Sequence, residues 1–178
     1  MQQDLLEQWL AQEREVVARR QLPPGPVRPE DVAGLAGVEV FRKMLDGKLH
    51  TAPIGTTLDF LILEAEDGRV VFQGTPGPSH LNPMGGIHGG WYATLLDSAM
   101  GCAVATRLPA GRAYTTAELS VNLVKAIGPK VRRVRAEGTI VHAGRQIATA
   151  EGRLYGPDGT LYAHGTTTCL VFEVAGKS

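Results

Sequence analysis

The segment 82–97 limits most strongly what this chain can fold into. It reads NPMGGIHGGWYATLLD, which is an Asn-Pro turn, a histidine between two glycine pairs, and an apolar helix start with one carboxylate, Asp97. Gly89 and Gly90 stand where the helix would begin, so the N–H groups there lack intrahelical acceptors and lie at the positive end of the helix dipole. Because glycine has no Cβ, a ligand can approach these N–H groups closely. The segment therefore predicts a site for an anion or a developing oxyanion.

The helix predicted over residues 91–107 is apolar on nearly every side. It reads WYATLLDSAMGCAVATR, and Asp97 is its only charged residue before the last position. A helix of this kind is expected to be buried. Asp97 follows Gly89 by about two helical turns, and a carboxylate buried without a partner has a raised pKa and is a candidate general base. The alternative is a structural Asp97 that accepts hydrogen bonds from Ser98, Thr94 or a nearby loop.

Length and charge exclude several classes of protein. The 178 residues, 19.0 kDa in mass, suit one domain with a substantial core. Eighteen basic and eighteen acidic residues give zero net charge, which does not favour nucleic acid or an anionic membrane as partner. No apolar run reaches the roughly 18 residues that cross a bilayer, and the polar start of the chain does not resemble a secretory signal. We therefore expect a cytoplasmic protein without membrane insertion.

The cysteines and histidines give no metal-binding pattern. Cys102 falls in the apolar helix and Cys169 in an apolar strand-like run, so both are predicted to be buried free thiols in a reducing compartment. The sequence contains no zinc-ligand spacing, no P-loop and no GxGxxG fingerprint, and neither a metal nor a cofactor is expected. The histidines other than His88 are interpreted as structural or surface residues: His50, His80, His142 and His164.

Periodicity and turn residues predict the order of elements. A helix over residues 2–20 is followed by a Pro-rich linker and by a second helix over residues 30–46. Two strands joined at Asp67-Gly68 precede the apolar helix, and four strands follow it. The expected strands cover residues 58–64, 69–74, 114–126, 131–142, 146–155 and 160–171. This order indicates the α+β class, with an antiparallel sheet curled around one helix. We expect a helical extension over residues 1–50 and the main domain over residues 51–178.

This pattern resembles the hotdog fold, in which a curved sheet wraps one central helix. Between about residues 53 and 172 the chain is similar to hotdog thioesterases of the phenylacetate-degradation type, within the 4-hydroxybenzoyl-CoA thioesterase superfamily. The resemblance continues through the strand residues 115–119 and the turn 143–145, while the first fifty residues lie outside it. The positions that carry it most specifically are Asn82, Pro83, Gly85, His88, Gly89, Gly90 and Asp97.

The resemblance implies hydrolysis of acyl-CoA thioesters, without a cofactor, at a site shared between two subunits. The chain is then expected to form at least a homodimer, and commonly a tetramer. Asp97 would be the general base for water or the nucleophile, and the Gly89 N–H would polarise the thioester carbonyl. Asn82 would orient the water or the substrate, unless it is only a turn residue. His88 would hold the loop and hydrogen-bond near the thioester, and Thr116 would help to place the water.

Other residues are candidates for substrate contact. Gly90 and Thr115 adjoin the catalytic candidates, and the sequence does not separate Thr115 from Thr116. Met84 and Trp91 are expected in an acyl pocket, although core or interface positions fit them equally. A group of basic residues either meets the CoA phosphates or forms a solvated face. These basic residues are Lys125, Lys130, Arg132, Arg133 and Arg135.

Two other functions fit the same fold. One is a hotdog module that binds or senses acyl-CoA without hydrolysing it, and the other is a hotdog dehydratase or hydratase that acts on 3-hydroxyacyl or enoyl thioesters. The presence of Asp97 and the lack of a basic recognition helix argue against a DNA-binding sensor. The spacing from His88 to Asp97 favours the thioesterase over the dehydratase. The N-terminal helices are left with three roles: capping the pocket, extending a dimer interface or shielding a sheet edge.

Overall fold

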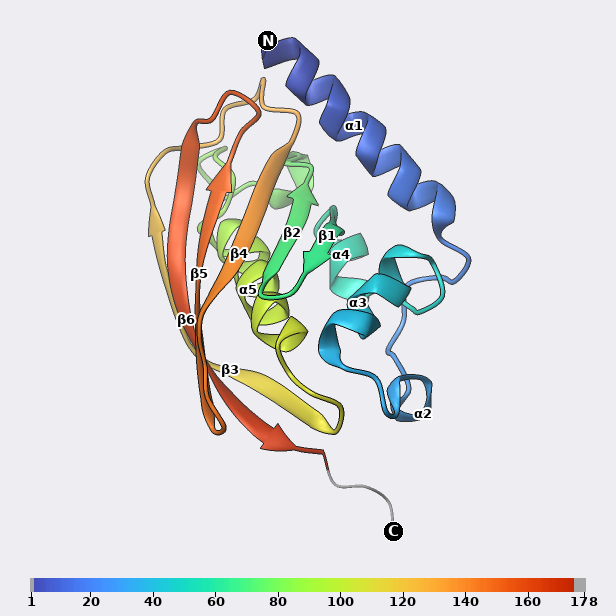
Figure 1. The fold of residues 1–178 in the computed structure, drawn as a ribbon. Helices are drawn as coiled ribbons and strands as arrows, with labels where there is room; N and C mark the ends of the chain where they lie inside the picture. The colour runs from blue at the N-terminus through green and yellow to red at the C-terminus, as the bar shows by residue number, and fades with distance from the viewer. Residues whose placement is uncertain (1, 175–178) are drawn as a thin grey trace.

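The computed structural model describes residues 2–174 and shows a six-stranded antiparallel sheet curved around one long helix, α5 (Figure 1). The helices are α1 (Gln2–Arg19), α2 (Pro29–Val32), α3 (Gly37–Leu45), α4 (Pro53–Thr57) and α5 (Gly89–Thr106), with a 3-10 turn at Pro78–His80. The strands are β1 (Phe60–Glu66), β2 (Arg69–Gly74), β3 (Arg112–Leu123), β4 (Val134–Ala143), β5 (Ile147–Tyr155) and β6 (Leu161–Glu173). The predicted α+β hotdog-like fold is confirmed.

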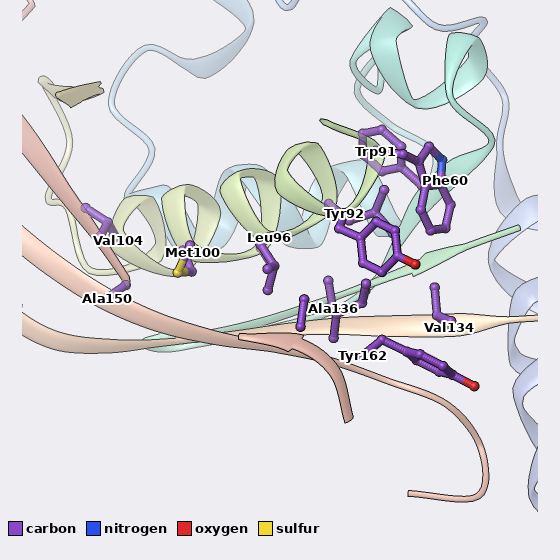
Figure 2. Packing of buried hydrophobic residues seen from close by; sticks show 14 of the residues in the cluster. Phe60, Trp91, Tyr92, Leu96, Met100, Val104, Val134, Ala136, Ala150 and Tyr162 are labelled. Carbon is purple, nitrogen blue, oxygen red and sulfur yellow. The ribbon is translucent and has the colours of Figure 1, made fainter. Parts of the chain in front are cut away.

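Helix α5 is the centre of the hydrophobic core. Its Leu95, Leu96, Met100 and Val104 side chains are fully buried, and the helix contacts all six strands. Figure 2 shows Leu96 and Met100 pointing from the helix toward the strands, opposite small residues such as Ala136. Small side chains on the sheet let the helix lie close to it, so the position of every α5 residue is fixed by this packing.

The strand order β1-β2-β4-β5-β6-β3 leaves β1 and β3 at the two edges of the sheet. The β1–β2 hairpin turns at Asp67-Gly68 as predicted, and the Gly68 N–H donates to Thr106 Oγ1 at 2.8 Å. This bond fastens the hairpin to the C-terminal end of α5. The opposite edge strand, β3, pairs only with β6 along the described chain 2–174, and most of its residues are exposed.

The predicted second helix over residues 30–46 was wrong as a single element. The chain forms α2 and α3 instead, separated at Gly34, whose φ of +76° is incompatible with a continuing helix. The α3 start is set by packing on the core, because the Gly37 N–H donates to Leu108 O at 2.9 Å. A Cβ at Gly37 would lie 1.8 Å from Ala105 O, so this contact requires glycine. The short helix α4 was not predicted.

Helix α1 covers the convex face of the sheet, on the side away from α5. Its Trp9, Leu10 and Val16 are buried. The helix covers two polar strand residues, Gln73 of β2 and Arg135 of β4. These two side chains are also buried, at 0% and 7% exposed, and Arg135 Nε donates to Gln73 Oε1 at 3.0 Å. The guanidinium of Arg135 stacks over the Trp9 ring at 4.3 Å. The extension is therefore packed directly on the main domain.

Glu13 of α1 completes this polar contact. Its carboxylate accepts from Arg133 Nε at 2.6 Å and from Gln73 Nε2 at 2.7 Å. Burial alone would raise the pKa of Glu13, but the hydrogen bonds and charge of Arg133, with the Gln73 bond, outweigh it and hold the pKa below 4.5. The ionised carboxylate is therefore favoured by folding.

The Glu13→Gln variant is expected to be less stable than the wild type near pH 7, and the difference should shrink in acid. A lowered native pKa contributes stability above the unfolded value of about 4.5, and this contribution is lost as pH falls through the native pKa. Urea unfolding at pH 7, 5, 4 and 3 measures it. Glu15→Gln is the control, since that exposed carboxylate pairs only loosely with Arg19, at 3.8 Å. A difference that stays constant with pH would contradict the role of the charge.

Candidate active site

The loop before α5 is held by two histidines and an asparagine. The His88 N–H donates to His80 O at 2.8 Å, and Leu81 and Ile87 form an isolated bridge. Asn82 Oδ1 accepts from the backbone N–H groups of residues 84 and 86, at 2.9 and 3.1 Å. The side-chain oxygen of Asn82 therefore closes the loop, and its amide NH₂ is the part left for another partner.

His80 braces this loop from inside. It is buried at 4% exposed, its Nδ1 accepts from the Gly77 N–H at 3.1 Å, and its ring stacks on Trp91. Trp91 is buried too, and its indole N–H donates to Leu58 O at 2.8 Å. Trp91 is thus a core residue that fixes the start of α5. The sequence had left a core position open beside an acyl pocket and an interface.

The first turn of α5 presents one free N–H. His88 is the N-cap residue, and its Nδ1 accepts from the Gly90 N–H at 2.9 Å. The next N–H, that of Trp91, donates to His88 O at 2.9 Å. The Gly89 N–H donates to no group within residues 2–174, so it is available to an incoming oxygen at the positive end of the helix dipole. The cap also places the proton of the neutral His88 ring on Nε2.

Asp97 lies beside the edge strand β3. The Thr116 hydroxyl donates to Asp97 Oδ1 at 3.0 Å. Neither hydroxyl of the structural alternative reaches Asp97, because Thr94 and Ser98 both donate to helix carbonyls, Gly90 O and Thr94 O, at 2.9 and 2.8 Å. The structure therefore brings together Asp97 and Thr116, which lie 19 positions apart in the sequence.

The sequence could not decide between Thr115 and Thr116, but the alternation of side chains along β3 places them on opposite faces of the strand. Thr116 faces α5 and Asp97, whereas Thr115 is exposed and pairs with the exposed Leu170 on the outer face. Met84 is 91% exposed in the loop before α5.

One stripe of α5 is uncovered, and it holds Asp97. The residues along it are partly or fully accessible, in contrast to the buried sides of the helix, and they recur at the three- and four-residue spacing of one helical face. They are Gly90, Ala93, Thr94, Asp97, Ser98 and Cys102. The expectation of a helix buried all round was therefore wrong, because the sheet wraps it incompletely. Asp97 is half-buried rather than enclosed, and solvent can reach it.

The groups around Asp97 are kept neutral. Burial raises the pKa of Tyr114 well above 10.0 and that of the Cys102 thiol to about 12, and the Asp97 charge adds to both shifts. Burial likewise raises the pKa of Cys169. Both cysteines are free, as predicted, although Cys102 is only half-buried. No thiolate or phenolate competes here with Asp97 as base or nucleophile near neutral pH. The sequence analysis missed Tyr114, which looked like an ordinary strand residue.

Part of the predicted basic surface is occupied by α1. Arg133 is paired with Glu13, and Arg135 is buried under Trp9, so neither faces a ligand. Lys125, Lys130 and Arg132 are exposed. Within residues 2–174 no three His, Cys, Asp or Glu side chains gather in the arrangement of a metal site. None of the helices in this part of the chain has the length and apolar character to span a bilayer.

Comparison with known proteins places this chain in a family. The profile of the thioesterase superfamily matches residues 84–163, which include Asp97 and Thr116. A solved protein of the thioesterase superfamily is 31% identical over 67% of this chain and 89% of its own, with a TM-score of 0.58. The chain belongs to the thioesterase superfamily.

Other solved members of this superfamily share the fold. A thioesterase family protein from Silicibacter pomeroyi is 25% identical, covers 78% of this chain and 97% of its own, and has a TM-score of 0.65. A thioesterase from Haemophilus influenzae is 17% identical over 70% of this chain and 85% of its own, with a TM-score of 0.64. No curated protein matches the chain significantly. The profile match begins after α1–α4 and the β1–β2 hairpin, so the N-terminal helices lie outside it.

Proposed function

We propose that this thioesterase superfamily member hydrolyses acyl-CoA thioesters, in the manner of the phenylacetate-degradation type, with Asp97 as general base and the Gly89 N–H as oxyanion donor. The observation that carries the proposal is the Asp97–Thr116 pair at 3.0 Å on the uncovered stripe of α5, the helix whose first N–H is free. A base and an oxyanion stabiliser are the two groups that thioester hydrolysis requires.

The proposed reaction uses each group once. Thr116 donates to Asp97 Oδ1, which leaves Oδ2 to accept a hydrogen bond from water. Asp97 takes a proton from this water as its oxygen attacks the thioester carbonyl carbon, and the Gly89 N–H that stabilises the resulting oxyanion comes from the partner subunit, because Gly89 and Asp97 of one chain lie about 12 Å apart along α5. When the tetrahedral intermediate collapses, the C–S bond breaks and the CoA sulfur takes the proton from Asp97. The free acid and CoA leave, and Asp97 is again ionised.

The histidine geometry favours hydrolysis over the dehydratase alternative. Proton abstraction by His88 would need a free ring nitrogen with a lone pair, and in this structure Nδ1 accepts from the Gly90 N–H. His88 then acts through Nε2–H as a hydrogen-bond donor, and Asp97 is the remaining base. The Oδ1 atom of Asn82 is already bound within the loop, so its amide NH₂ would donate to substrate or water.

We also propose that the working form is at least a homodimer paired through β3. This edge strand is 12 residues long, and its inner face exposes Leu119 and Leu123, at 36% and 55%. An open edge with exposed leucines is a template for a second strand. Light scattering should give a mass of at least twice 19.0 kDa. An active particle with the mass of one chain would contradict this arrangement and a site shared between subunits.

Free-thiol release from a panel of aryl and aliphatic acyl-CoAs tests the function. Release of CoA with formation of the free acid supports the proposal. A change in enoyl absorbance without thiol release would identify a dehydratase or hydratase instead. Acyl-CoA binding without any turnover would identify a sensor.

A further inference from the structure

A hollow at the C-terminal end of α5 is walled by the N-terminal extension. We call it the α3–β3 groove. Its volume is about 800 Å³, and it lies between the segment 29–41 on one side and the end of α5 with the start of β3 on the other. Apolar side chains form most of its walls. Among them are Val32, Leu35, Val40, Leu108, Ala113 and Val174.

The groove and the candidate active site share two elements, α5 and β3. On α5, Ala105 lines the groove and lies two turns beyond Asp97 on the same helical face. On β3, Tyr114 lines the groove and precedes Thr116 on the inner face of the strand. Tyr114 also packs on Gly101, one turn after Asp97, where its hydroxyl would lie 2.9 Å from an added Cβ. Tyr114 therefore stands between Asp97 and the groove, and an acyl chain whose carbonyl lies near Asp97 would reach the groove by displacing this one side chain.

The charged side chains at the rim of the groove are already paired. Arg112 donates to Arg145 O and lies 3.7 Å from Glu173 Oε1, and Glu30 lies 3.6 Å from Arg28. Apart from the Nε of Arg112, a buried donor without a partner among the described residues, the groove offers an apolar wall. Its volume falls in the range of about 300–1,000 Å³ that is usual for small-molecule sites.

The other cavity beside α5 is less suited to the substrate. It measures about 350 Å³, lies on the β1 side of the helix, and is bordered by Glu13, Arg20 and Asp59. Cys102 is the α5 residue that borders it. Cys102 stands at the end of the uncovered stripe, so this cavity also borders the stripe, and its smaller volume and charged border make it the poorer fit for an apolar acyl group.

We propose that the α3–β3 groove binds the apolar acyl group of the thioester, so that the segment 29–41 sets the acyl-chain length that this enzyme accepts. This inference rests on the proposed function. It assigns the N-terminal extension one of its three candidate roles, walling the substrate pocket, through residues outside the part of the chain that matches the thioesterase superfamily profile.

Val40→Trp tests the inference, because a half-buried valine of the groove is replaced by a side chain that fills it. We expect kcat/KM for octanoyl- and decanoyl-CoA to fall at least about tenfold, with acetyl- and butyryl-CoA changed less than about twofold. Val38→Trp, on the same helix and outside the groove, is the matched control. Val40→Ala, which enlarges the groove, should retain or improve activity on the longer chains. It keeps the inference testable if the tryptophan variant does not fold.

The outcomes separate this inference from the proposed function. An equal loss for all chain lengths, or a change in oligomeric mass on Val40→Trp, would assign the groove to a second copy of the chain and overturn the inference. Unchanged long-chain kinetics in both Val40 variants would also overturn it. If the wild type releases no thiol, the proposed function fails. Calorimetric titration with octanoyl-CoA then decides the groove alone, with weaker binding to Val40→Trp than to Val38→Trp supporting it and equal binding contradicting it.

Discussion

The Asp97→Asn variant is expected to fold normally and to lose acyl-CoA hydrolysis by about 10²–10⁴-fold in kcat, the usual contribution of a general base. Asparagine has the shape of aspartate. In the wild type the Thr116 hydroxyl donates to Asp97 Oδ1 at 3.0 Å, and the amide oxygen of asparagine can accept the same hydrogen bond. The amide cannot take a proton from water. Thiol release under saturating substrate measures the loss, and circular dichroism with a thermal melt checks the fold.

Two matched variants show whether the loss of turnover in Asp97→Asn is specific to this carboxylate. Asp46→Asn makes the same change at an exposed carboxylate that pairs only with Lys48, at 3.4 Å, and should keep wild-type turnover. Thr116→Val removes the hydroxyl and should lower kcat less than Asp97→Asn, because the base remains. Full activity of folded Asp97→Asn would rule out both of its proposed chemical roles. If Asp97 acts as nucleophile, free thiol should appear in a burst ahead of the acid in a rapid-mixing experiment.

The sequence predicted the centre of the molecule well because its signals there are local. A glycine pair after a histidine marks the start of α5, and the structure shows His88 as the cap of that helix. Alternation and turn residues located all six strands, and the Asp67-Gly68 hairpin forms where it was expected. In such segments the pattern of a few neighbouring residues decides the structure.

The sequence failed where contacts between distant segments decide. The chain breaks at Gly34, and the start of α3 then follows from the fit of Gly37 against Ala105 O, a contact that no local pattern announces. Arg133 and Arg135 resembled a phosphate-binding surface because their partners on α1 lie more than a hundred positions away. Likewise, the uncovered stripe beside Asp97 depends on how far the sheet wraps, which is a property of the whole fold. The assignment of site residues to chemical steps stays a prediction for the variants to test.

Among glycine-to-alanine substitutions in the sheet, Gly138→Ala is expected to be the most destabilising. Gly138 of β4 faces α5, where an added Cβ would lie 2.3 Å from the carbonyl carbon and oxygen of Ala99 and 2.6 Å from Met100 N. These are backbone atoms of a buried helix, so no side chain can rotate away. Gly138 pairs with Gly152, where an added Cβ would also meet α5, at 2.8 Å from Met100. These two glycines set the distance between sheet and helix.

We expect Gly138→Ala to lower the free energy of unfolding by about 3 kcal/mol, the upper part of the usual range for overpacking, and the melting temperature by about 6–12 °C. Gly128→Ala is the control, since an added Cβ there meets nothing within 4 Å, and its melting temperature should match the wild type. The loss of activity in Gly138→Ala should exceed the loss of folded protein. A helix displaced at Ala99 also moves Asp97 relative to Thr116 on β3, so the molecules that do fold should be less active than the wild type. An unchanged melting temperature would mean that α5 lies farther from the sheet than the 2.3 Å contact requires, and the geometry assigned to Asp97 would have to be redrawn with it.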